Sequence, residues 1–322
     1  MRKKEKRSPL LWLLLSLAAL GLFAWALRGV ELAEIGRVLS QISGGQIITL
    51  LVVNGAIVLL MSLRWWLILR AQGFLLPILR IVRYRLAAFG VSYFTPGPHF
   101  GGEPLQVVLL RQEHSLESSS AVVSVTLDKV LDLLSNFGFL SIGIAIVLRN
   151  GLIGSELLIG VQTISAVLLV LPLLYLLALL RGWAFVTYLL AKVKQNWAML
   201  AKDGEAQLII LLRDKRKLVV QSLMVSALLW IALLFEYWLA LRYLGLNLGL
   251  VQLLAIVVAA RLAMLAPTPG ALGALEAAQV VAMQSQGFDP SYGLSLSLLI
   301  RARDILFGGL GLWLGGRLLR QK

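Results

Sequence analysis

Ionisable side chains interrupt segments of the chain that are otherwise apolar, and they are the residues best placed to do chemistry. An isolated charge at the centre of a bilayer costs about 2.5 to 3.5 kcal/mol on insertion scales. Such residues must pair or face water, so they predict ion pairs, proton carriers or a headgroup site. The acids and bases concerned are Glu103, Asp128, Asp132, Glu236, Glu276 and Asp304, with Arg64, Lys129, Arg261, Arg301 and Arg303.

Two of these acids have matched positions. Glu103 and Glu276 each lie eight residues after a Thr-Pro-Gly sequence, which begins at Thr95 and at Thr268. A carboxylate at the start of a short helix can bind a cationic headgroup or a proton. The same offset of 173 aligns Asp128 with Arg301. We therefore expect these four residues to bind substrate or protons, and Asp128 to pair with Arg301. The expected supporting polar network is Lys129, Asp132, Glu236, Arg261, Arg303 and Asp304.

The composition excludes a soluble globular enzyme. Hydrophobic residues make up 59% of the 322 residues and charged residues 14%, against about 45–50% and about 25% in ordinary domains. The excess apolar surface predicts an all-α polytopic membrane protein. The chain has no cysteine and only two histidines, which excludes a thiolate site and disfavours any metal. It also lacks a P-loop and the common catalytic motifs, so we expect no cofactor and no enzyme activity.

The hydropathy pattern predicts six full spans and two shorter apolar segments. The shorter segments, 86–94 and 250–266, stop at proline and glycine, and helical runs resume at 104–110 and 275–284. Each unit is typical of a re-entrant hairpin, over 86–111 and 250–286. The residues expected to break the helices are Thr95, Pro96, Gly97, Gly101, Gly102, Pro267, Pro269 and Gly270. The full spans are 10–27, 46–69, 119–148, 157–180, 218–241 and 291–316, the first of which resembles an uncleaved helix more than a signal peptide.

An internal repeat organises this single domain of residues 1–322. The 16 residues from Thr95 and from Thr268 share seven identities without a gap. The repeats would cover 46–148 and 218–316, and their hairpins would enter from opposite sides. Inverted repeats of this kind place transporter sites near the bilayer midplane.

The basic residues predict the orientation. With both termini in the cytoplasm, 21 of the 30 lysines and arginines lie inside and four outside, as the positive-inside rule requires. The net charge of +14 then reflects orientation and lipid headgroups, not nucleic acid. The segment 182–217 is expected to form a cytoplasmic amphipathic helix on the inner leaflet. Gly311 and Gly315 would allow close helix contact, and Trp65 and Trp66 would be interfacial anchors.

Four sequence blocks resemble a known family. They are Gly101-Gly102-Glu103-Pro104, Asp128-Lys129 with Asp132, Pro267 to Gly270 with Gly273 and Glu276, and Arg301 near Arg303. Their order and spacing are similar to those of the transmembrane region of the lysylphosphatidylglycerol synthetase and flippase family. The resemblance implies movement of an aminoacylated phospholipid between leaflets. It implies a stand-alone member, so we do not expect the synthetase activity here.

The leading hypothesis is a lipid translocase of a prokaryotic plasma membrane, driven downhill or by an ion gradient. Its expected partners are membrane lipids, anionic or aminoacylated phospholipids above all, and a homodimer or a lipid-modifying enzyme. One alternative is an intramembrane enzyme acting on a lipid-linked substrate such as a polyprenyl glycan. A second alternative is a non-catalytic accessory subunit. An assay with fluorescent lipids in liposomes separates the three.

Overall fold

A computed structural model describes residues 21, 32–95, 101–114, 117–151, 155–184, 187–188 and 195–320. Throughout these residues the regular structure is helical. The predicted first span, 10–27, lies outside them apart from Gly21. The elements are α2 (Leu32–Ser40), α3 (Gly44–Ala71), α4 (Ile78–Phe94), α5 (Glu103–His114), α6 (Ser118–Arg149), α7 (Ser155–Leu180), α9 (Gln195–Asp214), α10 (Arg216–Tyr243), α11 (Leu250–Ala263), the 3-10 turn η1 (Pro269–Ala271), α12 (Ala274–Gln284) and α13 (Pro290–Arg320).

Four helices among the described residues are long and apolar enough to cross a membrane. They are Gly44–Ala71, Ser118–Arg149, Gly160–Leu180 and Lys217–Tyr243, and they match four of the predicted spans. Helix α13 has 31 residues, but Arg301, Arg303 and Asp304 interrupt its apolar sequence. The protein is therefore a multi-pass helical membrane protein.

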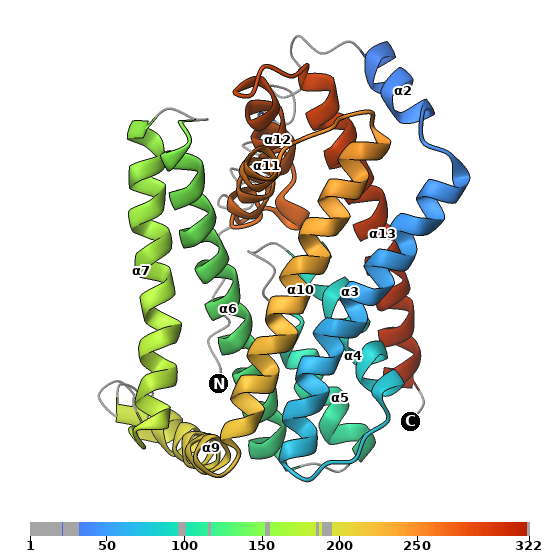
Figure 1. Ribbon diagram of the computed structural model, residues 1–322. Helices are drawn as coiled ribbons and strands as arrows, with labels where there is room; N and C mark the ends of the chain where they lie inside the picture. The colour runs from blue at the N-terminus through green and yellow to red at the C-terminus, as the bar shows by residue number, and fades with distance from the viewer. Residues whose placement is uncertain are drawn as a thin grey trace.

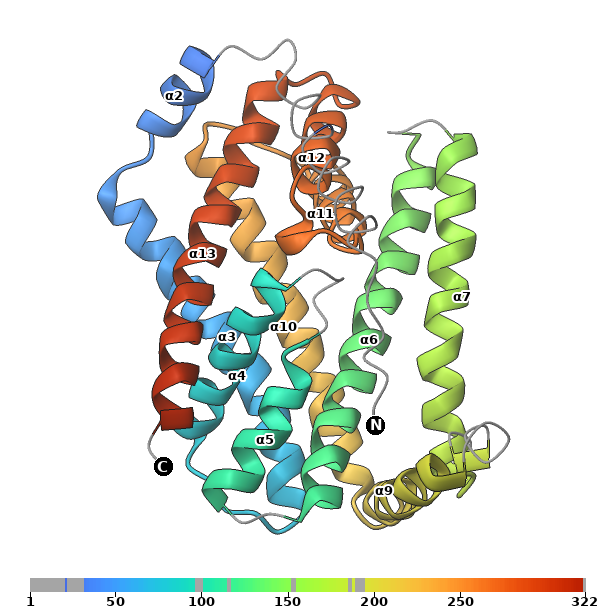
Figure 2. The same cartoon turned by 180° about the vertical axis from the view of Figure 1, so that it is seen from behind.

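The helices form an elongated bundle in which the long helices run between two ends (Figure 1). Helices α3 and α10 pack side by side, and α6 packs against α7. The shorter helices occupy different halves: α4 and α5 lie toward the end that holds α9, whereas α11 and α12 lie toward the end that holds α2 (Figures 1 and 2). Each short pair thus reaches only part of the way along the bundle.

Helix α9 crosses the end of the bundle beside α6, α7 and α10. Leu208, Leu211 and Leu212 are buried in a core cluster with residues of α6 and α7, while Lys202 and Arg213 are exposed. The helix is amphipathic, but its apolar face packs on protein. The expectation that this face rests on lipid is wrong for these leucines, because the ends of α6 and α7 cover them.

Helices α4 and α13 pack against each other along an extended contact. A Cβ at Gly311 would overlap with the Leu86 carbonyl oxygen, and one at Gly315 would lie 3.2 Å from the Ala87 Cβ. The absence of side chains at these two positions lets the backbones approach, as the Gly311–Gly315 spacing predicted.

We expect Gly311→Ala to lower the stability of the protein by about 1–3 kcal/mol, because the added methyl group forces α4 and α13 apart. The matched control is Gly309→Ala on the same helix, since no atom lies within 4 Å of a Cβ there. Thermal unfolding in detergent measures both. Equal melting temperatures for the two variants would contradict the close packing.

Candidate functional site

The end of α4 contacts the second helix break. The end of α4 touches the η1 turn that follows α11. Gly270 in that turn has a φ of 54°, and a Cβ there would lie 2.8 Å from Tyr93 Cζ of α4. Both the left-handed backbone and the adjacent ring require glycine. The end of α4, just before the first break, therefore packs on the second break.

The second break is held by an ion pair between Glu276 and Arg301. Glu276 lies in the first turn of α12, and its two carboxylate oxygens bind Arg301 Nε and, at 2.8 Å, a terminal nitrogen of the same guanidinium. Arg301 also donates to the carbonyl oxygens of Gly270 (3.1 Å) and Ala271 (3.3 Å). The Glu276 side chain is 0% exposed. This bidentate pair ties α13 to the break, and its carboxylate is closed to solvent.

The first break has a similar pair that is open. Glu103 lies in the first turn of α5, and its carboxylate is 2.8 Å from Lys129 Nζ of α6. The Gly101 amide donates to Glu103 Oε2 (2.9 Å), as the Gly273 amide donates to Glu276 (2.9 Å). The Glu103 and Lys129 side chains are 26% and 24% exposed. This pair can exchange partners with a ligand, which its counterpart cannot do without opening.

The pairing corrects the expected equivalence of Asp128 and Arg301. Glu103 and Glu276 are 173 residues apart, but their bases, Lys129 and Arg301, are 172 apart. Lys129 follows Glu103 by 26 positions, whereas Arg301 follows Glu276 by 25, so the alignment slips by one position before α6 and α13. A slip of one residue turns a helix by about 100°. The predicted Asp128–Arg301 pair is therefore wrong, and Lys129 is the counterpart of Arg301.

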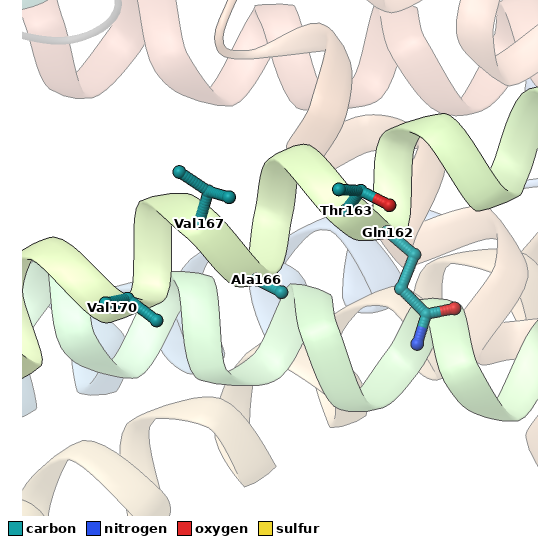
Figure 3. Close-up of a pocket in the computed structure, with 5 residues that line it drawn as sticks. All are labelled: Gln162, Thr163, Ala166, Val167 and Val170. Carbon is teal, nitrogen blue, oxygen red and sulfur yellow. The ribbon is translucent and has the colours of Figure 1, made fainter.

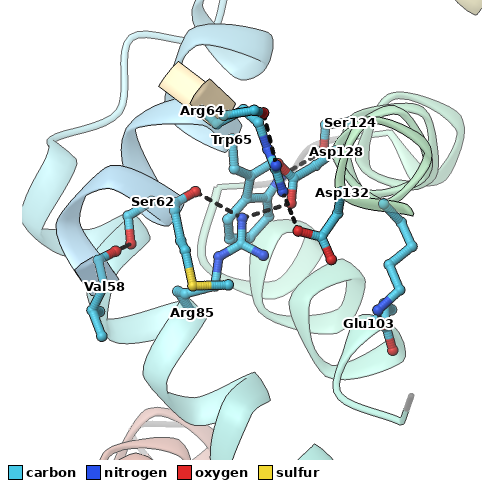
Figure 4. A network of polar contacts seen from close by, with 12 residues as sticks. Val58, Ser62, Arg64, Trp65, Arg85, Glu103, Ser124, Asp128 and Asp132 are labelled. Atoms are coloured by element: carbon cyan, nitrogen blue, oxygen red, sulfur yellow. Dashed lines mark hydrogen bonds and ion pairs between the residues drawn. The ribbon is translucent and has the colours of Figure 1, made fainter. Parts of the chain in front are cut away.

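Asp128 instead belongs to a buried network of α3, α4 and α6 (Figure 4). Arg64 Nε lies 2.8 Å from Asp128 Oδ1, and Arg85 lies 2.6 Å from Asp128 Oδ2. Arg64 also binds Asp132 at 3.0 Å. The Arg64 side chain is 1% exposed and that of Asp128 6%. Two cations thus share two carboxylates, which compensates the desolvation of each.

Sequence reasoning missed the roles of Arg85 and Trp65 in this network. Arg85 lies just before the predicted apolar segment 86–94, but α4 begins at Ile78 and carries it into the interior. Trp65 is fully buried. Its ring lies 5.3 Å from the Arg85 guanidinium carbon, and its indole N–H donates to Ser124 (3.3 Å). Its assignment as an interfacial anchor is wrong, because it packs under a cation in the core.

A second buried network joins α10 and α13. Arg303 binds Glu236, and it lies 2.8 Å from Asp304. Arg303 also donates to the side-chain oxygen of Asn54 on α3 (3.1 Å), and the Asn54 amide donates to Glu236 (3.1 Å). The predicted supporting residues Glu236, Arg303 and Asp304 thus form one cluster, separate from that of Asp132.

Both buried networks link α3 to α10, but the charged residue lies on α3 in one network and on α10 in the other. Arg64 of α3 donates to Ser226 of α10 (3.1 Å), while Asn54 of α3 binds Glu236 of α10. Arg64 and Glu236 are 172 residues apart, and so are Asn54 and Ser226. Positions 172 apart therefore hold opposite charges, and each charge has its polar partner on the other helix.

The other expected helix-break residues have structural roles. The Thr95 hydroxyl donates to the Val91 carbonyl (2.7 Å) at the end of α4. Gly102 donates to Ser92 Oγ (2.9 Å), and a Cβ there would overlap with the Ala88 carbonyl. Pro267 lies in the bend after α11, and Pro269 begins η1. Pro96 and Gly97 lie outside the described residues.

Arg261, near the end of α11, differs from the other interior arginines. Its guanidinium carbon lies 5.0 Å from the centroid of the Trp230 ring, and one nitrogen lies 4.0 Å from the Met264 sulfur. Within the described residues no carboxylate lies at ion-pair distance from it. It does not belong to either buried network.

The hollows of the described surface are apolar. A hollow of about 490 Å³ lies against one face of α7 (Figure 3), where Gln162, Thr163, Ala166, Val167 and Val170 line it. None of these side chains is charged, so this hollow is no site for a charged headgroup. Within the described residues, His, Asp and Glu side chains also form no group of three that could hold a metal ion.

Comparisons with known proteins identify the family. Residues 10–311 match the family described as the lysylphosphatidylglycerol synthase TM region. The chain belongs to this family. It is also similar to a UPF0104 membrane protein of Pyrococcus horikoshii, with 24% identity over 264 residues that cover 76% of this chain and 78% of the relative. Members of the lysylphosphatidylglycerol synthase TM-region family have a lipid-related role in membranes, so the interior charges described above belong to a lipid-handling membrane protein.

The buried network around Asp128 predicts strong thermodynamic coupling. We expect Arg64→Gln and Asp128→Asn each to cost about 3–5 kcal/mol, because each leaves a partner buried and uncompensated. Asp132→Asn should cost about 1 kcal/mol or less, because the Asp132 side chain is 36% exposed. Thermal unfolding of the purified variants measures these losses.

The double variants test the corrected pairing. The losses for Arg64→Gln and Asp128→Asn should be far from additive, whereas those for Asp128→Asn and Arg301→Gln should add within about 0.5 kcal/mol. Coupling between Asp128 and Arg301 with none between Asp128 and Arg64 would overturn the assignment.

Proposed function

We propose that this protein translocates phospholipids, with the headgroup passing the contact between the two helix breaks while the acyl chains stay in the bilayer. The observation that carries the proposal is the unequal exposure of the ion pairs at the two breaks. Glu103–Lys129 is about a quarter exposed, whereas the Glu276 carboxylate is sealed against Arg301. A zwitterionic or charged headgroup can exchange with the open pair, since both of its charges find an opposite partner there.

An inverted repeat with re-entrant hairpins is the architecture we propose for this movement. Helices α3, α4, α5 and α6 start at 44, 78, 103 and 118, and helices α10, α11, α12 and α13 start at 216, 250, 274 and 290. The starts differ by 171 or 172 positions in every case. The short helices of the two sets lie in opposite halves of the bundle (Figure 2). Both observations support an inverted pair of hairpins.

The interior acids support transport over the alternative enzyme. Glu103, Asp128, Asp132, Glu236, Glu276 and Asp304 each bind at least one Lys or Arg. Carboxylates held as ions by bases are poor general acids. Glu103 is the most accessible member of the two break pairs. We propose it as the proton carrier if an ion gradient drives the movement, because a headgroup that displaces Lys129 would free its carboxylate to take up a proton. As the protein partner we propose a second copy of the chain or a lipid-modifying enzyme.

We expect Glu103→Gln to slow headgroup movement about tenfold or more, because a charge-assisted hydrogen bond of about 1.5–3 kcal/mol to the headgroup is lost. Fluorescent phospholipids in proteoliposomes report this movement when an impermeant reductant bleaches only the outer leaflet. Glu117→Gln is the matched control, since Glu117 is exposed before α6. The melting temperature should change little for either variant.

Glu276→Gln should lower both transport and the melting temperature, because Arg301 loses its buried partner. Equal transport by wild type, Glu103→Gln and Glu276→Gln would contradict the proposed site. A new lipid product without headgroup movement would favour the intramembrane enzyme instead.

The proposed orientation places both termini and α9 in the cytoplasm. The chain has no cysteine, so single cysteines report cleanly. In intact cells, an impermeant thiol reagent should label Asn150→Cys, at the end of α6, and should not label Asp203→Cys in α9. Labelling of Asp203→Cys from outside would reverse the topology.

A further inference from the structure

The last turn of α4 touches residues of both helix breaks. The Ser92 hydroxyl oxygen accepts a hydrogen bond from the Gly102 amide (2.9 Å), at the end of the first break. The next residue, Tyr93, lies against the η1 turn of the second break, where a Cβ on Gly270 would be 3.1 Å from the Tyr93 hydroxyl oxygen. Two neighbouring residues of one helix therefore hold one break each.

Tyr93 also reaches the ion pair that closes the second break. Arg301 donates to the Gly270 carbonyl oxygen (3.1 Å), so the guanidinium and the phenol meet at the same glycine. The Tyr93 hydroxyl and the Arg301 guanidinium also share a side-chain hydrogen bond. Tyr93 is 5% exposed, and a Cβ on Gly308 of α13 would be 3.7 Å from its ring. Tyr93 therefore lies between η1 and α13, next to the pair of Arg301 and Glu276.

The phenol accompanies the closed ion pair alone. The starts of the two sets of helices differ by 171 or 172 positions, and the position 172 after Tyr93 is Leu265. A leucine side chain cannot bond to a cation or a carbonyl, and Leu265 is 37% exposed. The Glu276 side chain is 0% exposed, whereas that of Glu103 is 26% exposed. The unequal exposure of the two pairs therefore goes together with an unequal neighbour.

We propose that Tyr93 is a positioning residue that locks Arg301 onto the second break, and that movement of the first break releases this lock. When a headgroup exchanges with the open ion pair, the start of α5 is freed. The adjacent Gly102 amide then moves the end of α4 through Ser92, and Tyr93 withdraws from the guanidinium. Packed and hydrogen-bonded side chains with two arrangements can carry such coupling. The proposal rests on the proposed function and gives it an order, in which the first break moves before the second opens.

Thiol reactivity at the second break tests the lock. Thr268 is 5% exposed and lies two residues before Gly270, so Thr268→Cys reports opening of this break in a chain with no other cysteine. In detergent micelles, Tyr93→Phe should raise the rate of its reaction with a water-soluble thiol reagent about tenfold. The reason is that opening no longer breaks a hydrogen bond to a charged guanidinium. The ring stays in place, so the melting temperature should change little.

Two controls separate the lock from general loosening. Tyr84→Phe removes a second buried phenol, in the first half of α4, whose hydroxyl lies 2.9 Å from His114 Nε2. It should leave the rate at position 268 unchanged. Ser62→Cys on α3, at a position that is 0% exposed, should stay unreactive when combined with Tyr93→Phe. Equal rates at position 268 in wild type and Tyr93→Phe would overturn the lock, and so would equal increases in Tyr84→Phe and Tyr93→Phe or fast reaction at position 62.

Glu103→Gln measures the coupling to the first break. Loss of the partly exposed ion pair loosens that break, so the rate at position 268 should rise about threefold while Tyr93 is present. The same change should add nothing in the Tyr93→Phe background, where the lock is already released. A tyrosine that only stabilises the fold would give independent effects. Rates that multiply in the double variant would therefore overturn the coupling.

Transport measured on the same variants separates this proposal from the proposed function. Coupled changes in thiol reactivity without headgroup movement in proteoliposomes would sustain the lock and contradict the translocase. Headgroup movement with equal thiol rates in all variants would sustain the translocase and contradict the lock.

Discussion

The cost of placing charges in an apolar bundle is the constraint on which this structure depends. A buried ion is tolerated only where a partner of opposite charge, with further hydrogen bonds, replaces its water. Asp128 meets this condition with Arg64 and Arg85, and Arg303 meets it with Glu236 and Asp304. Each cluster joins different helices, so the need for neutralisation fixes which helices pack and at what rotation. Apolar packing alone is far less specific inside a membrane, where lipid competes equally for the same surfaces.

The same constraint explains how the two helix breaks differ. Both short helices begin with a glutamate that accepts a hydrogen bond from a preceding glycine amide, which satisfies a backbone donor left free by the break. Arg301 also binds two carbonyl oxygens of the second break, so that break is closed. Lys129 is a flexible point charge with no comparable fork, and its pair with Glu103 is partly exposed. One rigid and one open tip suit a path that lets a polar group reach the bilayer interior.

Much of the fold follows from hydropathy, because a helix of about 20 apolar residues is the simple way for a chain to cross a bilayer. The positions of the breaks also follow, since proline and glycine stop helices wherever they occur. The partners of the charges do not follow. Pairing depends on the rotation of each helix. The second segment has one residue fewer between Glu276 and Arg301 than the first has between Glu103 and Lys129, and this difference makes Lys129, not Asp128, the residue that matches Arg301. Arg85 was missed because a charge next to the predicted end of an apolar segment is typical of a loop. Helix α4 instead begins about two turns before the predicted segment 86–94 and includes Arg85.

The proposed headgroup path requires that water reaches the first helix break, while the pair of Glu276 and Arg301 keeps the second break closed until a headgroup passes. Thr95 and Thr268 occupy equivalent positions at the two breaks; Thr95 is half-buried and Thr268 is 5% exposed. Each can become cysteine with little change in volume, in a chain that has no other cysteine. The most direct measurement is the reaction rate of Thr95→Cys and Thr268→Cys with a water-soluble thiol reagent in proteoliposomes. The account predicts fast reaction at position 95 and slow reaction at position 268. Equal rates, or reaction at position 95 only with a lipid-soluble reagent, would contradict it.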